Sequence, residues 1–292
     1  MSSMTATGST LGVLARQEIR HYLQHKLFWI GAALVLALNV VQLFHLDHDP
    51  GSSGSYMIAP AALLGVLGLV VMFGLTRRSD RAAEAAGVVA VPERTRTLAL
   101  AAATVVPFSV ALLSFVLAVI TWYVHPPAAY VVPPGISNAF VHAEQFGDGV
   151  VCAIGGPILG LLLARYLPRR GTAPVASVLL VIVTILMQGG LVGGEQPYRV
   201  LWFWTYFLTQ RTVGDVWHMG TLPGNPFLWV LYLLTLCALG VVVAVRHDPE
   251  SDRAALTKVA LGLIALAVVL GVLTMVLGYT EGVISPGVCE FC

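Results

Sequence analysis

Charged side chains are scarce in this 292-residue chain: Asp, Glu, Lys and Arg make up 11% and apolar residues 57%. A soluble globular domain carries about 25% charged and about 45–50% apolar residues. The apolar residues gather into runs such as 98–124 and 259–279, each long enough to cross about 30 Å of hydrocarbon as a helix. This composition excludes an ordinary soluble enzyme and predicts an all-α polytopic membrane protein.

An excess of either charge is also missing, because the formal net charge is +1. Nucleic-acid binding normally needs a basic surface, so nucleic acid is not an expected partner. The first residues are small and polar, and the first long apolar run begins only after Lys26. That pattern does not match a cleavable signal, and we expect the N-terminus to be retained.

Catalytic and nucleotide-binding motifs are absent from the sequence. It contains no HExxH, no GxSxG and no GxxxxGK[ST], and the dipeptide Gly-Lys never occurs. The centres of the expected spans also lack Asp, Glu, Lys, Arg and His, which normally mark ion or proton pathways. We therefore expect a chain that is not an enzyme and holds no cofactor, and any ATP-driven work would use ATP and Mg on another chain.

Apolar runs bounded by charges or turn residues predict seven spans. They are 27–46, 57–75, 98–124, 150–167, 173–192, 227–245 and 256–279.

The basic residues predict the orientation of these spans. With the N-terminus inside, 14 of the 16 lysines and arginines are cytoplasmic, and only Arg199 and Arg211 lie outside. Because loop lysines and arginines stay in the cytoplasm, we expect a multi-pass plasma-membrane protein with a cytoplasmic N-terminus and an extracytoplasmic C-terminus.

The four cysteines fall into two groups. Cys152 and Cys237 lie within expected spans and are typical of buried small apolar side chains. Cys289 and Cys292 lie in the expected external tail, where an oxidising compartment favours a structural disulfide or a link to a partner. Redox chemistry is the alternative.

Histidines and acids are dense in the expected external loops, with His45, Asp47, His48 and Asp49 in the first and His142 with Glu144 in the second. Imidazole and carboxylate groups together can bind a divalent metal. No ligand spacing specifies a geometry here, so we predict a solvated loop and no metal site.

Two elements are predicted at the cytoplasmic face. Residues 11–26 form an amphipathic helix with Arg16 and Arg20 on its polar side. In the loop after the second span, Ser79 can cap a short helix that runs to Ala86 and stops at Gly87. Either element can simply enforce orientation, or it can contact a cytoplasmic partner.

This order of elements resembles the permeases of type-2 ABC exporters. The resemblance covers the amphipathic helix, two spans, an Arg/Glu/Gly loop with a Pro-x-x-x-Arg-Thr re-entry at 92–97, and the further spans to about Arg246. The aromatic segment 198–208 resembles the re-entrant external helices of that family. The seventh span exceeds the six-span core of the family and is expected on its outside.

The resemblance implies roles for several residues. Arg16 and Arg20 would lie on the helix that connects to the ATPase, and Arg81, Glu84 and Gly87 would form the ATPase-coupling loop. It also implies a dimer with a second permease copy or homologue, in a complex with cytoplasmic ABC ATPase subunits in the lipid bilayer.

The expected organisation is therefore a cytoplasmic region at 1–26, a six-span membrane domain at 27–246, and an extra span with an external tail at 247–292. The expected function is ATP-driven export of an amphipathic or hydrophobic substrate, because the spans offer apolar surfaces. Two alternatives are a membrane anchor or assembly subunit that does not transport, and an extracytoplasmic metal or redox protein.

Overall fold

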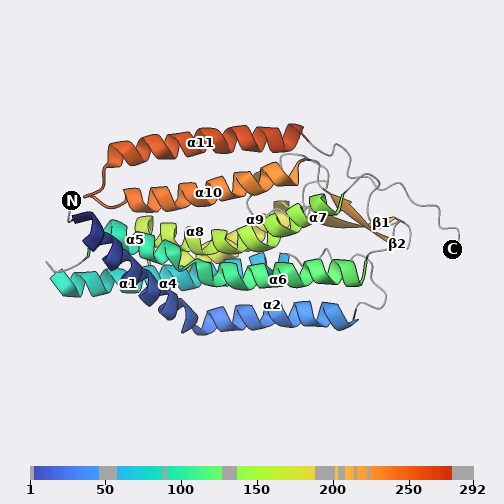
Figure 1. The fold of residues 1–292 in the computed structure, drawn as a ribbon, viewed down its shortest axis with the longest axis horizontal. Helices are drawn as coiled ribbons and strands as arrows, with labels where there is room; N and C mark the ends of the chain where they lie inside the picture. The colour runs from blue at the N-terminus through green and yellow to red at the C-terminus, as the bar shows by residue number, and fades with distance from the viewer. Residues whose placement is uncertain are drawn as a thin grey trace.

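The computed structural model describes residues 3–45, 58–87, 91–126, 137–187, 201–202, 208–213, 216–221 and 224–277. Within these ranges the chain forms a bundle of long helices whose axes run along the longest dimension of the molecule (Figure 1). Six helical stretches are long and apolar enough to cross a membrane. The prediction of a helical, multi-pass membrane protein is thus confirmed.

The helices follow the order of the apolar runs. They are α1 (Ser3–Leu23), α2 (Lys26–His45), the π-helical η1 (Pro60–Gly65), α4 (Val66–Ala86), α5 (Glu93–Ala102), α6 (Val105–Val124), α7 (Asn138–Gln145), the π-helical η3 (Phe146–Val151), α8 (Cys152–Tyr166), α9 (Thr172–Ile185), α10 (Pro226–Arg246) and α11 (Arg253–Val276). A short antiparallel hairpin, β1 (Leu208–Val213) with β2 (Val216–Thr221), pairs Leu208 with Thr221 and was not predicted.

Three predicted spans differ from the structure. The second span continues through residues 79–86, so α4 is one uninterrupted helix and Ser79 caps no separate short helix. The fourth begins at Asn138 rather than at residue 150, because Ser137 accepts a hydrogen bond from Phe140 N at 3.2 Å and starts α7 early. The fifth corresponds to α9, whose 14 described residues are too few to cross the hydrocarbon alone.

The centre of the bundle consists of α4 and the continuous stretch α7–η3–α8. In their most apolar windows 61% and 72% of residues are buried, against 28% for α11. The α8 helix approaches η1 and α4 closely, as two distances show. A Cβ on Gly156 would lie 1.9 Å from Gly65 O of η1, and one on Gly160 would lie 2.2 Å from Leu69 O of α4. Small residues at a four-residue spacing allow such backbone approach between membrane helices.

The outer helices expose large apolar side chains. Examples lie on α2, α6, α9 and α11 and include Phe44, Ile120, Ile185 and Val268. Such surfaces match contact with lipid chains. The α11 helix packs along α10 at one side of the bundle (Figure 1).

Basic residues gather at one end of the bundle. We call it the basic end and define it by Lys26, Arg78, Arg96, Arg165 and Arg246, which lie at or near the ends of α2, α4, α5, α8 and α10. The α1 helix lies diagonally across the bundle at this end (Figure 1). The basic residues that the sequence assigns to one side of the membrane therefore include a group at one end of the helix bundle.

Candidate functional site

An ion-pair network joins four helix ends at the basic end. Asp80 Oδ1 near the end of α4 accepts hydrogen bonds from Arg165 Nη1 of α8 at 2.6 Å and from Arg96 Nη1 of α5 at 3.0 Å. The Arg165 side chain is only 2% exposed, whereas that of Asp80 is 27% exposed. This carboxylate therefore compensates a buried guanidinium, which would be costly without a partner.

The first turn of α5 extends the network to α10. Glu93 Oε1 lies 3.6 Å from Arg165 Nη1 and 2.6 Å from Nδ1 of His247, which directly follows α10. The next residue, Asp248, accepts a hydrogen bond from the backbone N–H of Arg94 at 2.8 Å. The ends of α4, α5, α8 and α10 are thus connected through charged groups.

The α1 helix packs against this end through one face. Leu11, Leu14, Ala15 and Ile19 are partly buried and Tyr22 is buried, as its amphipathic pattern predicts. Glu18, which departs from that pattern, is also buried and lies 3.5 Å from both Arg78 Nη2 and His21 Nδ1. An acidic residue on the apolar face of α1 therefore pairs with the end of α4.

Burial also affects titration along this contact. It raises the pKa of the Tyr22 hydroxyl above its ordinary value and lowers the pKa of His25, between α1 and α2. Burial therefore favours the neutral form of both groups.

A groove of about 220 Å³ lies between α1 and the end of α4. Gln17 and Glu18 of α1, Ala82 and Ala83 of α4 and Arg96 of α5 contribute to its lining. The two elements that the sequence places at the cytoplasmic face therefore form one continuous surface.

The residues that the resemblance assigns to ATPase contact are exposed at the same end of the bundle, but none of them lines this groove. Arg81 and Glu84 lie on the last turns of α4, and Arg16 and Arg20 lie on the outer face of α1. Their side chains make no ion pair or hydrogen bond within the described ranges. Gly87 ends α4 with a positive φ of 58°, and its N–H donates to Ala83 O. A Cβ would strain this conformation, so glycine suits the position.

Several other predicted residues lie outside the described ranges. They include Asp47, His48, Asp49, Cys289 and Cys292, and also most of the aromatic segment 198–208. Cys152 and Cys237 are buried, as predicted for small apolar side chains within spans. In the part of the chain that the structure describes, no group of three His, Cys, Asp or Glu side chains is placed to hold a metal ion.

Two acidic residues are placed differently from the prediction. Glu144 was expected in an external loop and the span centres were expected to lack ionisable residues, but Glu144 and Asp148 are each 1% exposed within the spanning stretch Asn138–Tyr166. The expectation was wrong because the Gly-Asp-Gly run at 147–149 is typical of a loop, whereas here it forms the π-helical η3. The helix cap at Ser137 was the signal that could have located them.

Comparisons with family models, with curated proteins and with solved structures found no match. The resemblance to type-2 ABC exporter permeases therefore depends on the layout of this chain.

Proposed function

We propose that this chain is the membrane-spanning permease subunit of an ABC exporter, with ATP and Mg bound by separate ATPase subunits. The observation that carries the proposal is a set of exposed charged side chains on α1 and on the last turns of α4. Arg16, Arg20, Arg81 and Glu84 are exposed and have no partner in the described ranges. Unpaired charges of both signs at one end of a membrane protein suit a soluble partner with complementary charges.

The arrangement of α4 supports a mechanical role for this surface. Because α4 continues without interruption from Val66 to Ala86, a displacement of Glu84 by an ATPase would be transmitted directly into the membrane part of the same helix. The ion pair from Asp80 to Arg165 and the hydrogen bond between Glu93 and His247 would carry that displacement to α8 and α10. In a dimer, paired movements of this kind would alternate access to a cavity between the two permeases.

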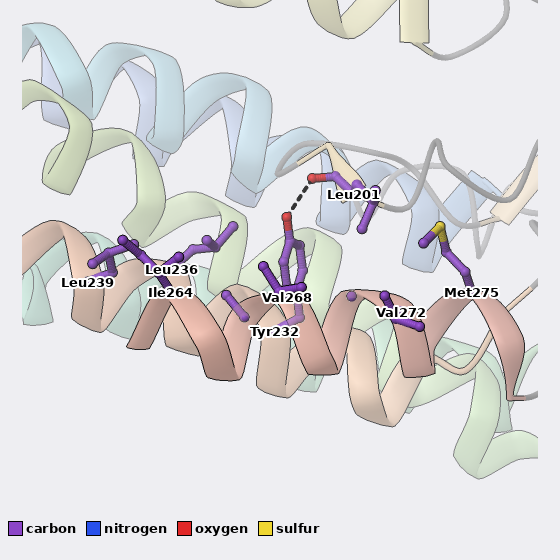
Figure 2. A pocket seen from close by; sticks show the side chains of 10 residues that line it. Leu201, Tyr232, Leu236, Leu239, Ile264, Val268, Val272 and Met275 are labelled. Atoms are coloured by element: carbon purple, nitrogen blue, oxygen red, sulfur yellow. Dashed lines mark hydrogen bonds between the residues drawn. The ribbon is translucent and has the colours of Figure 1, made fainter. Parts of the chain in front are cut away.

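The substrate class follows from the apolar surfaces of the outer helices. Between α10 and α11 lies a groove of about 340 Å³ lined by Tyr232, Leu236, Ile264, Val268 and Met275 among others. Figure 2 shows that the Tyr232 hydroxyl donates to Leu201 O, at 2.8 Å. The groove is otherwise apolar, and it suits an acyl chain or another hydrophobic group better than a hydrophilic ion.

Purification of the tagged chain from its native membrane tests the proposal. We expect an ATPase with a GxxxxGK[ST] motif to co-purify in stoichiometric amount, and its ATP hydrolysis in proteoliposomes to respond to an amphipathic substrate. Matched purifications of a variant with Arg16, Arg20, Arg81 and Glu84 all replaced by Ala should yield less ATPase. ATP hydrolysis by the isolated chain would contradict the proposal, and a bound partner without ATPase activity would favour an anchoring or assembly subunit.

A further inference from the structure

Two carboxyl groups lie buried in the membrane domain, away from the basic end. Glu144 is in the last turn of α7 and Asp148 follows four residues later in η3. All four of their carboxyl oxygens are inaccessible to water and lack a hydrogen-bond partner within the described part of the chain. Residues four apart share a helix face, so the two groups form one buried acidic pair.

Among the residues that the structure describes, no lysine or arginine side chain is close enough to neutralise this pair. The segments that pack on η3 are η1, α6, α7, α8 and α10, and Arg165 and Arg246 are their only lysines or arginines. Arg165 follows Asp148 by 17 residues on one continuous helix, which corresponds to about 25 Å. The other titratable groups of these segments are His142, Tyr123, Cys152, Tyr166, Tyr232 and Cys237; η1 contributes none.

An ionised carboxylate without partner or water is strongly unfavourable in an apolar interior, and two adjacent ones repel each other as well. A proton on each group removes both costs and needs no additional volume in a closed site. We propose that Glu144 and Asp148 form a proton-binding site in the membrane domain, with both carboxyl groups protonated at pH 7.

The local packing connects this site to the position of neighbouring helices. Trp229 of α10 is fully buried, and a Cβ on Gly147 would lie 2.6 Å from its Cζ3 atom. The π-helical segments η1 and η3 also contact each other, and π-helical turns inside α-helices are frequent at functional sites. Loss of the protons would require water or a cation beside Asp148, so η3 would have to move away from Trp229.

A short chain of polar groups starts at Gln145, next to Glu144 in the sequence, and leads towards the surface at the end opposite the basic end. His142 Nδ1 lies 3.0 Å from Gln145 Oε1, and His142 Nε2 lies 3.3 Å from the hydroxyl of Tyr123. Tyr123 is 60% exposed. Gln145 Nε2 and the four carboxyl oxygens have no hydrogen-bond partner in the described part of the chain, so this chain of polar groups stops short of Glu144 and Asp148.

This inference goes beyond the proposed exporter function, because it requires no ATPase and can be tested on the isolated chain. Infrared spectroscopy of the full chain in lipid nanodiscs detects the C=O stretch of protonated carboxylic acids directly. We expect this band at pH 7, where exposed carboxyl groups are ionised. It should lose about half of its intensity in Glu144→Gln or Asp148→Asn and disappear in the double variant.

The control is Glu250→Gln, which removes an exposed carboxyl group and should leave the band unchanged. Absence of the band in the wild-type protein at pH 7 would overturn the proposal without any variant. Loss of the wild-type band on addition of NaCl at constant pH would overturn it in favour of a sodium site.

Discussion

Arg165 Nη1 lies 2.6 Å from Asp80 Oδ1, and this contact joins the ends of α8 and α4 across 85 residues of sequence. The same guanidinium is 3.6 Å from Glu93 Oε1, while its Nε and Nη2 atoms have no hydrogen-bond partner in the described ranges. A buried arginine with so few partners depends strongly on each of them. The acidic residues at the basic end therefore hold the helices together there, in addition to balancing the positive charge.

Replacing Asp80 with Ala should lower the free energy of unfolding by about 3 kcal/mol, since the buried Arg165 guanidinium would lose its closest partner. Thermal unfolding in detergent micelles measures the change. Glu84→Ala is the matched control, because Glu84 is an exposed acid on the same helix and should change stability by only about 0.5 kcal/mol. Equal effects of the two substitutions would show that the Asp80 contact contributes nothing to stability.

Gly156→Ala should destabilise the bundle, because the added Cβ would meet Gly65 O at 1.9 Å. Overpacking of this kind costs about 1–3 kcal/mol, and a backbone atom cannot rotate away. Gly74→Ala in α4 is the control, since its Cβ would meet nothing within 4 Å and alanine favours the helix by about 1 kcal/mol. Melting temperatures in detergent should thus change in opposite directions, and a neutral Gly156→Ala would refute the close approach of α8 to η1.

Replacing both Arg81 and Glu84 with Ala should reduce substrate-stimulated ATP hydrolysis of the complex, while membrane insertion and melting temperature stay close to wild type. The reason is that both side chains are exposed and unpartnered in the described ranges, so their loss affects a partner more than the fold. Coupled ATPase and transport assays in proteoliposomes measure the effect. Wild-type coupling in this variant would mean that the end of α4 serves only to orient the chain.

A membrane-impermeant thiol reagent applied to intact cells after mild reduction should label Cys289 or Cys292. The two remaining cysteines, Cys152 and Cys237, are buried and should not react, so the label reports the tail alone. In Cys289→Ser/Cys292→Ser the label should disappear. Labelling of the wild type only after lysis would place the C-terminus in the cytoplasm and would remove one of the seven predicted spans.

The fold class could be predicted from the sequence because membrane spans require long uncharged runs. Each such run can be recognised from its own residues, without knowledge of its neighbours in the fold. The predicted span 227–245 and the helix Pro226–Arg246 are nearly the same segment for this reason. Which face of α1 is buried was likewise predictable, since a helical period of 3.6 residues places Ile19 and Tyr22 together. The exposed positions of Arg16 and Arg20 follow from the same periodicity.

Other features depended on contacts between residues far apart in the sequence. Asp80 could be read as a helix-start residue until the structure placed the Arg165 guanidinium beside it. Glu144 and Asp148 lie in a run whose glycines predict a loop, and only packing against α10 places that run inside the bundle. Local sequence determined where most of the long apolar helices lie, whereas the tertiary structure decided which charges are paired or buried, because pairing and burial depend on neighbours supplied by other helices.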